Sequence, residues 1–462
     1  MWDLVVLTAG NVKQKADFEL YLKSLDLSQY VGEVAVIADD LEDVKIGSGG
    51  STVHVIWNLY RKYGGNLVAK RVLLIHSGGL STRMPHISAR GKIFTQLPGS
   101  KTMLEAKLAS YRELSTAIRA GVVITASDVI EDVRKFKDHP KDCDFLLFGH
   151  ESDIEIAKNH GVYVMDPRGH LRTVLQKPDE DALQTYFGQH LPQKFLTDSF
   201  YWISWDIALK LKDLARKNMN FEVCCYGDFM FCLGTCPNED YIFEGTNQAR
   251  RTLRQIICNV LKGSAVRVVN MGEDSFFHFG TATEFLDHID KNAIFYQKFL
   301  GTLIENRFAN SSIQNLTMAP GSRVFIENCQ LMDVEVTGDC IISGVATTEK
   351  LVLDNTLLFT MDLISQKFVT FAFGIKDNLK AAQPNLKWFG KDIGQTKPDM
   401  WSESLFPASG DREESLKATV ALMNQPGKSL CRIGTEFPMS IGSAVAMNNT
   451  QATIDRNQRI LL

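Results

Sequence analysis

The chain has 462 residues, of which 45% are hydrophobic and 23% are charged. This length and composition allow two or three domains with sizeable buried cores and exclude an intrinsically disordered chain. The formal net charge of -4 gives no overall attraction to nucleic acid or to an anionic membrane, so an anionic ligand would have to meet a local basic patch.

Short β-branched runs alternate with longer helical stretches through the first 290 residues. The opening segment MWDLVVLTAG lacks a basic flank and predicts a core strand rather than a signal peptide. Alternation of this kind predicts an α/β fold with a mostly parallel sheet, in which ligands bind at the carboxyl ends of the strands. The predicted strands are Leu4–Leu7, Val34–Ala38, Val72–Ile75, Val122–Thr125, Phe145–Phe148 and Val162–Met165.

The sequence pattern changes from about Asn310 to Phe373, where short apolar runs alternate with turn residues and helical periodicity is weak. Apolar residues recur there at about six-residue intervals, as at Val324, Val336 and Ile342, and Gln330 interrupts the series. This spacing favours a β-rich, β-helix-like domain. We therefore expect an α/β domain over residues 1–300, a β-rich domain over 301–375 and a mixed extension of unknown role over 376–462, with one helix near Glu413 to Asn424.

The segment from Val44 to Leu104 contains no Asp or Glu but nine Lys or Arg residues, although the average composition would place about seven acids there. It holds two glycine clusters, GSGGST over 47–52 and HSGG over 76–79, each after a predicted strand. Glycine lets backbone amides approach an anion, and a helix N-terminus adds partial positive charge. Phosphate binding is thus favoured over ordinary turns on a solvated basic face. Neither cluster is a Walker A loop, and Thr52 stands where a G-x-G-x-x-G motif needs its last glycine.

Nine cysteines, an odd number in a long chain, predict reduced thiols and a cytoplasmic protein, and no run reaches the roughly 20 apolar residues of a membrane span. The densest group raises a zinc alternative. Its spacing is not paired C-x-x-C and no His lies nearby, which favours buried free thiols. The group consists of Cys224, Cys225, Cys232 and Cys236.

The segment SGGLSTRMP, followed by Gly91 and Lys92, resembles the G-x-G-T-R-x-x-P…K loop of the nucleotide-sugar pyrophosphorylases. Four further segments, KIGSGGSTVH, HGVYVMDPRG, CCYGDFM and AFGIKDNLK, narrow the resemblance to the GDP-fucose pyrophosphorylase family, from Trp2 to at least Leu379. That resemblance implies a Rossmann-like nucleotidyltransferase domain followed by a left-handed β-helix-like domain. It implies formation of GDP-L-fucose and pyrophosphate from GTP and β-L-fucose 1-phosphate, with Mg²⁺ or Mn²⁺. Some relatives carry a fused fucokinase, whose phosphate loop we do not find here.

By the same resemblance, Arg83 would bind the β and γ phosphates of the nucleotide and Lys92 would reach the α phosphate. The alternative for Arg83 is a surface ion pair. The glycine clusters would present amides and hydroxyls to the nucleotide, although the sequence does not assign one to the base and one to the triphosphate. The nucleotide-binding candidates are Gly47, Ser48, Gly49, Gly50, Thr52, Gly78 and Gly79.

For the metal, the resemblance points to Asp128 at the end of VVITASD, where an Asp could also simply cap the next helix. The second metal-binding Asp of the superfamily is replaced by His278 in FFHFGTATEF, and imidazole is a poor magnesium ligand. One carboxylate with the phosphates, Asp228 as a substitute ligand, and contact of His278 with the sugar phosphate remain open.

For the sugar, VLQKP resembles the superfamily E-K-P element, with Gln176 in place of Glu. Lys177 would meet the fucose phosphate, although a Lys before Pro can be only a loop charge. Thr197, Asp198 and Ser199 are candidates for the sugar hydroxyls.

Two competing hypotheses remain. The first is the same chemistry on another nucleoside triphosphate and sugar 1-phosphate. The second is a catalytically silent regulatory subunit that uses the β-rich domain for assembly, which the presence of Arg83, Lys92 and Asp128 disfavours. Small-molecule substrates are expected, with no nucleic acid or membrane partner, and oligomeric state is left open.

Overall fold

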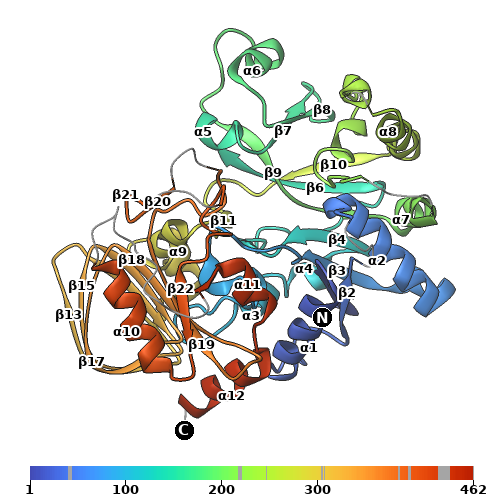
Figure 1. Ribbon diagram of the computed structural model, residues 1–462. Helices are drawn as coiled ribbons and strands as arrows, with labels where there is room; N and C mark the ends of the chain where they lie inside the picture. The colour runs from blue at the N-terminus through green and yellow to red at the C-terminus, as the bar shows by residue number, and fades with distance from the viewer. Residues whose placement is uncertain are drawn as a thin grey trace. The chain divides into compact units, whose positions relative to one another are not determined.

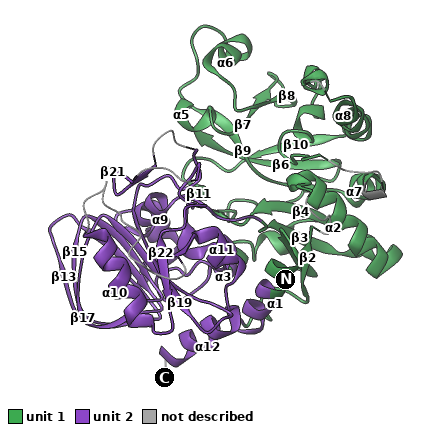
Figure 2. Ribbon diagram, viewed as in Figure 1, with its two compact units in different colours: residues 1–16, 26–78, 107–277 green, residues 17–25, 79–106, 278–462 purple. Residues whose placement is uncertain are grey.

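The structure is a computed structural model that describes residues 1–39, 44–216, 221–245, 247–302, 305, 307–382, 386–393, 397–424 and 438–460. The chain divides into two compact units, each assembled from separate parts of the sequence (Figure 2). Unit 1 comprises residues 1–16, 26–78 and 107–277, and unit 2 comprises residues 17–25, 79–106 and 278–462. Unit 2 thus combines the predicted β-rich segment and the tail with two short segments from the first quarter of the chain.

All six strands predicted in the first 290 residues are present in a nine-stranded sheet of unit 1 (Figure 1). Strands β2, β1, β3 and β4 are parallel neighbours, β9 runs antiparallel to both β4 and β6, and β10 is parallel to β6. The sheet is therefore mixed and rich in parallel pairs. Its strands are β1 (Leu4–Ala9), β2 (Val34–Ala38), β3 (Arg71–His76), β4 (Gly121–Ala126), β6 (Phe145–Ser152), β7 (Gly161–Met165), β8 (Leu171–Gln176), β9 (Phe195–Ile203) and β10 (Val266–Asn270).

Alternate residues of the central strands pack under helices on one face of this sheet. Leu4 and Val6 of β1, with their counterparts on β3 and β4, share one core with buried residues of α2, α7 and α8. The two-residue period puts these side chains on one face because successive strand residues point to opposite sides. The helices described in or reaching unit 1 are α1 (Val12–Lys23), α2 (Gly47–Tyr63), α3 (Met103–Ser110), α4 (Leu114–Ala117), α5 (Ile154–Ala157), α6 (Glu180–Phe187), α7 (Trp205–Lys212) and α8 (Gln248–Leu261).

Unit 2 is built on two ladders of short parallel strands. One contains β13 (Ser312–Met318), β15 (Gln330–Thr337) and β17 (Ala346–Asp354). The other contains β12 (Phe308–Ala309), β14 (Arg323–Glu327), β16 (Asp339–Ser343) and β18 (Thr356–Asp362). Val324, Val336 and Ile342 of the predicted six-residue series are buried in one core, and Gln330 is exposed.

The strands that follow β18 are antiparallel, which the sequence pattern did not predict. β19 (Phe368–Gly374) pairs with β18 and with β22 (Phe406–Ser409), and β22 pairs with β23 (Pro438–Met439). A small hairpin joins β20 (Lys387–Trp388) to β21 (Lys391–Asp392), and β5 (Val129–Glu131) pairs with β11 (Phe276–His278).

Four helices complete unit 2, and the predicted tail helix is one of them. They are α9 (Ala282–Ile289), α10 (Arg412–Met423), α11 (Ile441–Ala446) and α12 (Thr450–Ile460). α10 begins at an Asp411 N-cap, whose carboxylate accepts a hydrogen bond from Glu414 N, and it packs on β19. Across the described residues, no helix is both long enough and apolar enough to span a membrane.

A buried ion pair fixes part of the basic segment inside unit 2. Arg90 donates from Nη2 to Oε1 of Glu327, at the end of β14, and the same oxygen accepts from Ser343 Oγ at 2.7 Å. Arg90 is 8% exposed and Glu327 is fully buried. Next to this pair, Gly91 has φ +76°, and an added Cβ would lie 2.7 Å from the Phe18 ring. The Arg90 charge, counted in the sequence as part of a basic patch, is therefore neutralised by a residue far along the chain.

We predict that Glu327→Gln destabilises unit 2 by about 3 kcal/mol, because a buried guanidinium loses its counter-charge. Thermal and urea unfolding of the full chain would measure the change. Glu335→Gln is the matched control, because Glu335 pairs with Lys350 at 2.7 Å on the surface, where ion pairs contribute about 1 kcal/mol or less. Equal losses in the two variants would contradict a special role for the buried pair.

Candidate active site

The loops after β1 and β3 are held together at the carboxyl edge of the unit 1 sheet. Thr8 Oγ1 accepts hydrogen bonds from the backbone amides of Ser77, at 3.0 Å, and Gly78, at 3.3 Å. A Cβ on Gly78 would lie 2.9 Å from the backbone nitrogen of Gly10. Gly78 therefore permits a close approach of two backbone segments at the edge where open α/β sheets bind ligands.

Asp128 lies at the same edge, two residues beyond β4. The preceding amide, of Ser127, donates to the carbonyl of His76 at 3.0 Å, which joins the β3 and β4 loops. Asp128 is half-buried, and its negative charge acts on the buried Lys107, whose pKa is lowered mainly by burial. Asp128 thus lies at the strand end as the sequence predicted, and its role as a metal ligand stays a prediction.

The first glycine cluster forms the N-terminal turn of α2, with no acidic residue in that turn. Gly47 has φ +69°, and a Cβ there would lie 2.5 Å from the carbonyl oxygen of Val223. The amide of Gly49 donates to that carbonyl at 2.7 Å, and Ser48 Oγ accepts from the amide of Cys225 at 3.1 Å. In this structure the two glycines allow the segment around Val223 to pack on the helix terminus.

The remaining candidates of that cluster are buried. Thr52 Oγ1 lies 2.9 Å from the Ser48 carbonyl oxygen and 3.0 Å from Nε2 of His76. Burial lowers the pKa of His76 to about 4, so this imidazole is neutral at pH 7. A Cβ on Gly50 would lie 2.8 Å from Cβ of Ile46. Thr52 accordingly connects the start of α2 to His76 at the end of β3. Gly50 lets the first turn of α2 pack closely on Ile46, the residue that precedes the helix.

Residues 79–92, which begin with the last glycine of the second cluster, belong to unit 2. We call them the second glycine segment. Gly79 has φ +131°, and an added Cβ would meet no atom within 4 Å. Arg83 is exposed, and its side chain forms no hydrogen bond or ion pair with any residue that the structure describes. The surface ion pair considered for Arg83 is therefore not found there, and of the two arginines in this segment only Arg90 is paired with a carboxylate.

Lys92 and His278, 186 residues apart in sequence, come together at the N-terminus of α9. Lys92 Nζ donates to the carbonyl of Gly280 at 3.3 Å. The amide of Gly280 donates to Oε2 of Glu284 at 2.9 Å, and His278 Nδ1 lies 3.5 Å from Oε1 of the same carboxylate. Burial alone would raise the pKa of Glu284, but His278 and the donors of Thr281 lower it to about 2. The segment FFHFGTATEF thus brings a histidine and a carboxylate beside Lys92.

Sequence reasoning missed Glu284, although a signal was present. Thr281 and Glu284 form a capping box at the start of α9, and T-x-x-E before an apolar helix is a readable pattern for this motif. The pattern would have placed the carboxylate at the helix terminus. It would not have shown that the same carboxylate approaches His278.

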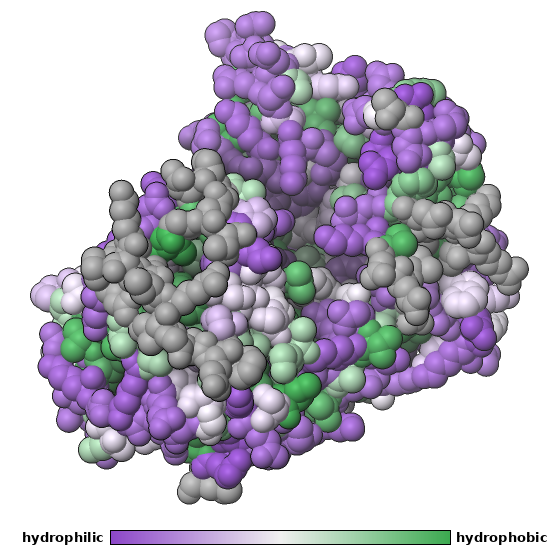
Figure 3. Space-filling view, in the orientation of Figure 1, coloured by the Kyte–Doolittle hydropathy of each residue, from purple (hydrophilic) through white to green (hydrophobic). Residues whose placement is uncertain are grey.

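The predicted sugar-side residues gather around β7, β8 and β9 of unit 1. Asp198 accepts hydrogen bonds from the amide of Gly161, at 2.9 Å, and from Nε2 of Gln176, at 3.3 Å. Burial raises the pKa of Asp198, while His160, 3.8 Å away, opposes that shift. Lys177 is exposed at the end of β8, with φ +48°. Over α5 and α6, next to these strands, the visible surface is mostly hydrophilic (Figure 3).

Thr197 and Ser199 flank Asp198 on β9, and both residues are buried. Thr197 Oγ1 lies 2.9 Å from Ser152 Oγ and 3.0 Å from Nε2 of His150, and Thr197 is fully buried. The carbonyl of Ser199 accepts from the hydroxyl of Tyr226 at 2.9 Å. Of the three consecutive candidates, Asp198 is the one whose side chain hydrogen-bonds to Gly161 and Gln176.

Asp228 already has partners for both of its carboxylate oxygens. Oδ2 accepts from the amide of Cys224 at 2.7 Å, and Oδ1 accepts from Nε of Arg254 at 3.0 Å. Among the residues described, no group of three or more His, Cys, Asp or Glu side chains could hold a metal ion. Both carboxylate oxygens of Asp228 are thus engaged in contacts within unit 1.

The cysteines around Asp228 do not share one environment. Cys225 and Cys232 are buried, whereas Cys224 and Cys236 are exposed. Burial raises the pKa of the Cys225 thiol to about 12, so that thiol is protonated at pH 7. Of the nine cysteines, Cys431 lies outside the described residues.

Comparison with known proteins identifies similar sequences over most of the chain. Residues 64–419 match the fucose pyrophosphorylase domain family. The chain is 27% identical to fucose-1-phosphate guanylyltransferase of Homo sapiens, over 100% of this chain and 90% of the human protein. It is 26% identical to the Mus musculus protein of the same name, over 92% of this chain and 86% of that protein. A bifunctional fucokinase/GDP-fucose pyrophosphorylase of Arabidopsis thaliana is 25% identical, over 69% of this chain and 35% of the plant protein.

We predict that Gly161→Ala destabilises unit 1 by about 1–3 kcal/mol, because its Cβ would lie 2.3 Å from Oδ2 of Asp198 and 2.5 Å from Nε2 of Gln176. Urea unfolding would measure the loss. Gly65→Ala is the control, since an added Cβ there meets nothing within 4 Å. If both variants unfold at the wild-type urea concentration, the contact of Gly161 with Asp198 does not constrain residue size.

Proposed function

This chain belongs to the fucose pyrophosphorylase family, and we propose that it is a nucleotidyltransferase that forms GDP-L-fucose and pyrophosphate from GTP and β-L-fucose 1-phosphate. The observation that carries the proposal is similarity over the whole chain to a human protein named fucose-1-phosphate guanylyltransferase. That match covers 90% of the human protein, so the similarity extends over nearly all of the relative's length.

In the proposed reaction, a phosphate oxygen of fucose 1-phosphate attacks the α phosphorus of GTP. A new P–O bond forms, the bond from the α phosphorus to the oxygen that bridges to the β phosphorus breaks, and pyrophosphate leaves with that oxygen. Two anions must approach each other, and unit charges 4 Å apart repel by about 4 kcal/mol at an effective dielectric of 20. Catalysis therefore depends on positive charge that is held in place before the anions meet.

Arg83 and Lys92 are the residues that we propose for this neutralisation. Arg83 suits a ligand role because it is exposed and has no partner among the described residues. A guanidinium can bind two phosphate oxygens at once, which fits the β and γ phosphates and the departing pyrophosphate. Lys92 would contact the α phosphate, and its hydrogen bond to the Gly280 carbonyl holds the ammonium group in place meanwhile.

The family resemblance also implies a divalent cation, and the residues present fit one. Mg²⁺ commonly takes one or two protein carboxylates and completes its shell with phosphates and water. Asp128 would hold the ion from its position two residues beyond β4, at the carboxyl edge of the unit 1 sheet. When bound, the ion would offset charge on the phosphate oxygens. His278 is proposed to act on the sugar phosphate, with Glu284 keeping its ring oriented.

On the sugar side, Lys177 is proposed to bind the phosphate of fucose 1-phosphate, because its ammonium group is exposed at the end of β8. Asp198 and Gln176 are proposed to recognise the sugar hydroxyls. Their mutual hydrogen bond, at 3.3 Å, is longer than the 2.8 Å bond from Gln176 to the Tyr226 carbonyl, which supports exchange of that contact for a ligand hydroxyl.

Two finer features complete the proposal. The parallel ladders of β13 to β18 would form a left-handed β-helix-like coil. The register of β14 and β16 supports this, because Arg323 lies opposite Asp339, 16 residues later in the chain. A cytoplasmic location is supported by the buried free thiols.

Arg83→Ala and Lys92→Ala are each expected to lower turnover at least about a hundredfold, the effect of losing one electrostatic contact to the transition state. Pyrophosphate release under saturating substrates is the measurement. Lys101→Ala is the control, because Lys101 is an exposed cation of the same acid-free segment without a proposed role. Wild-type turnover in either test variant would remove that residue from the mechanism.

A substrate panel tests the specific reaction. GTP with fucose 1-phosphate is expected to give at least about tenfold higher kcat/KM than ATP, UTP or CTP, or than mannose or galactose 1-phosphate. The physical reason is that an unmatched base or hydroxyl leaves buried polar groups unpaired, at about 1–3 kcal/mol each. Equal rates across the panel would leave a nucleotidyltransferase without the proposed selectivity.

A further inference from the structure

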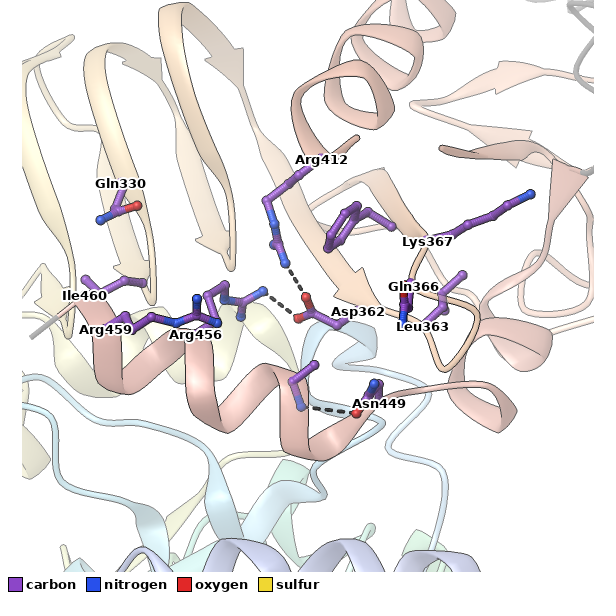
Figure 4. A pocket seen from close by; sticks show the side chains of 12 residues that line it. Gln330, Asp362, Leu363, Gln366, Lys367, Arg412, Asn449, Arg456, Arg459 and Ile460 are labelled. Carbon is purple, nitrogen blue, oxygen red and sulfur yellow. Dashed lines mark hydrogen bonds and ion pairs between the residues drawn. The ribbon is translucent and has the colours of Figure 1, made fainter. Parts of the chain in front are cut away.

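A cavity of about 430 Å³ lies within unit 2, and none of its lining residues belongs to the candidate active site described above. It is bordered by the turn between β18 and β19, the first turn of α10, one side of α12 along its length and the start of β15 (Figure 4). Its polar lining residues are Gln330, Asp362, Gln366, Lys367, Arg412, Asn449, Arg456 and Arg459. None of these residues is required by the proposed transferase reaction.

Two arginines share one buried carboxylate in this cavity. Arg412 donates from Nη2 to Oδ1 of Asp362, and Arg456 donates from Nη1 to Oδ2 at 2.7 Å. Figure 4 shows the two guanidinium groups approaching Asp362 from α10 and α12. Asp362 is only 5% exposed. One buried negative charge therefore faces two half-buried positive charges.

The surroundings of Arg412 show that placing two guanidinium groups beside one carboxylate disfavours the charged form of arginine. Its guanidinium lies 4.6 Å from the centre of the Phe368 ring and donates to the carbonyl of Gly344 at 2.7 Å. Burial, with repulsion from Arg456, lowers the pKa of Arg412 to about 10 despite the attraction of Asp362. An additional anion beside the two arginines would offset this repulsion.

Two more cations line the same cavity. Lys367 comes from the β18–β19 turn, and Arg459 lies one turn beyond Arg456 on α12. Asp362 is the only carboxylate among the twelve lining residues, whereas three arginines, Arg412, Arg456 and Arg459, line the same cavity. The ammonium end of Lys367 points away from Asp362 (Figure 4). The local balance of positive charge contrasts with the net negative charge of the whole chain.

We propose that this cavity binds the phosphate of a small phosphate monoester, at a site separate from the substrate residues. A phosphate dianion matches the excess charge, and its oxygens suit the paired donors of arginine. The amides of Gln330, Gln366 and Asn449 supply neutral donors and acceptors for hydroxyl groups of the ester. The volume fits a ligand of metabolite size and is too small for a macromolecular partner.

Calorimetric titration of the full chain with inorganic phosphate and with glycerol 3-phosphate, at constant ionic strength, tests the proposal. Gln330→Glu adds an anion to the lining, and Arg459→Gln removes a cation from it. Gln314→Glu is the matched control, since Gln314 is exposed on the neighbouring strand β13 and does not line the cavity. Arg83→Ala identifies any phosphate bound through the proposed substrate segment.

The expected result is binding that persists in Gln314→Glu and Arg83→Ala, weakens at least about tenfold in Gln330→Glu and weakens severalfold in Arg459→Gln. Phosphate alone would then be sufficient, whereas binding of glycerol 3-phosphate only would show that the ester group contributes. Absence of binding by both compounds, equal weakening in the two glutamate variants, or loss in Arg83→Ala with retention in Gln330→Glu would overturn the proposal. Because binding is read without turnover, a failure of the transferase proposal would leave these outcomes distinguishable.

Discussion

The ion pair of Arg90 with Glu327 is the interaction on which the second glycine segment depends. Residues 79–92 contain little regular structure, and a loop of that kind does not fix its own conformation. Arg90 connects the segment to the end of β14, and Gly91 fits against Phe18. Arg83 and Lys92 lie on either side of this anchored part of the chain. The β-rich half of unit 2 thus holds in place the cations to which we assign the nucleotide phosphates.

Charged side chains in this protein differ in burial and in how completely they are paired. Lys107 and Glu131, both at most 2% exposed, form a closed pair in which Lys107 Nζ also donates to the carbonyl of Val129. Such pairs satisfy each other and leave no capacity for a ligand. Arg83 and Lys177 are exposed, so their charge is accessible to an incoming anion. Arg412 and Arg456 at Asp362 differ from both kinds, because they are half-buried and their two charges exceed that of Asp362. Burial and pairing together, rather than the number of basic residues, therefore distinguish binding cations from structural ones.

Much of the sheet could be predicted because apolar strands carry their own signal. The runs at Val72 and Val122 are short, β-branched and bounded by turns, and both form central strands. The roles of Gly47 and Gly49 could not be read in the same way, because they depend on packing against Val223, a contact that is distant in sequence. The pairing of Arg90 with Glu327 was hidden for the same reason. The family motif supplied Arg83 and Lys92, whereas the carboxylate beside His278 required the structure.

The composition of unit 2 from separated segments has a consequence for how the protein is made. Residues 79–106 leave the ribosome long before Glu327 and the strands around it have been synthesised. Until those later residues emerge, Arg90 lacks its counter-ion Glu327 and the segment has no β-rich surface to pack against. The early segments of unit 2 therefore cannot complete their folding until the later part of the chain has been synthesised. For the same reason, no single cut in the polypeptide separates the two units into fragments that each retain all of their own residues.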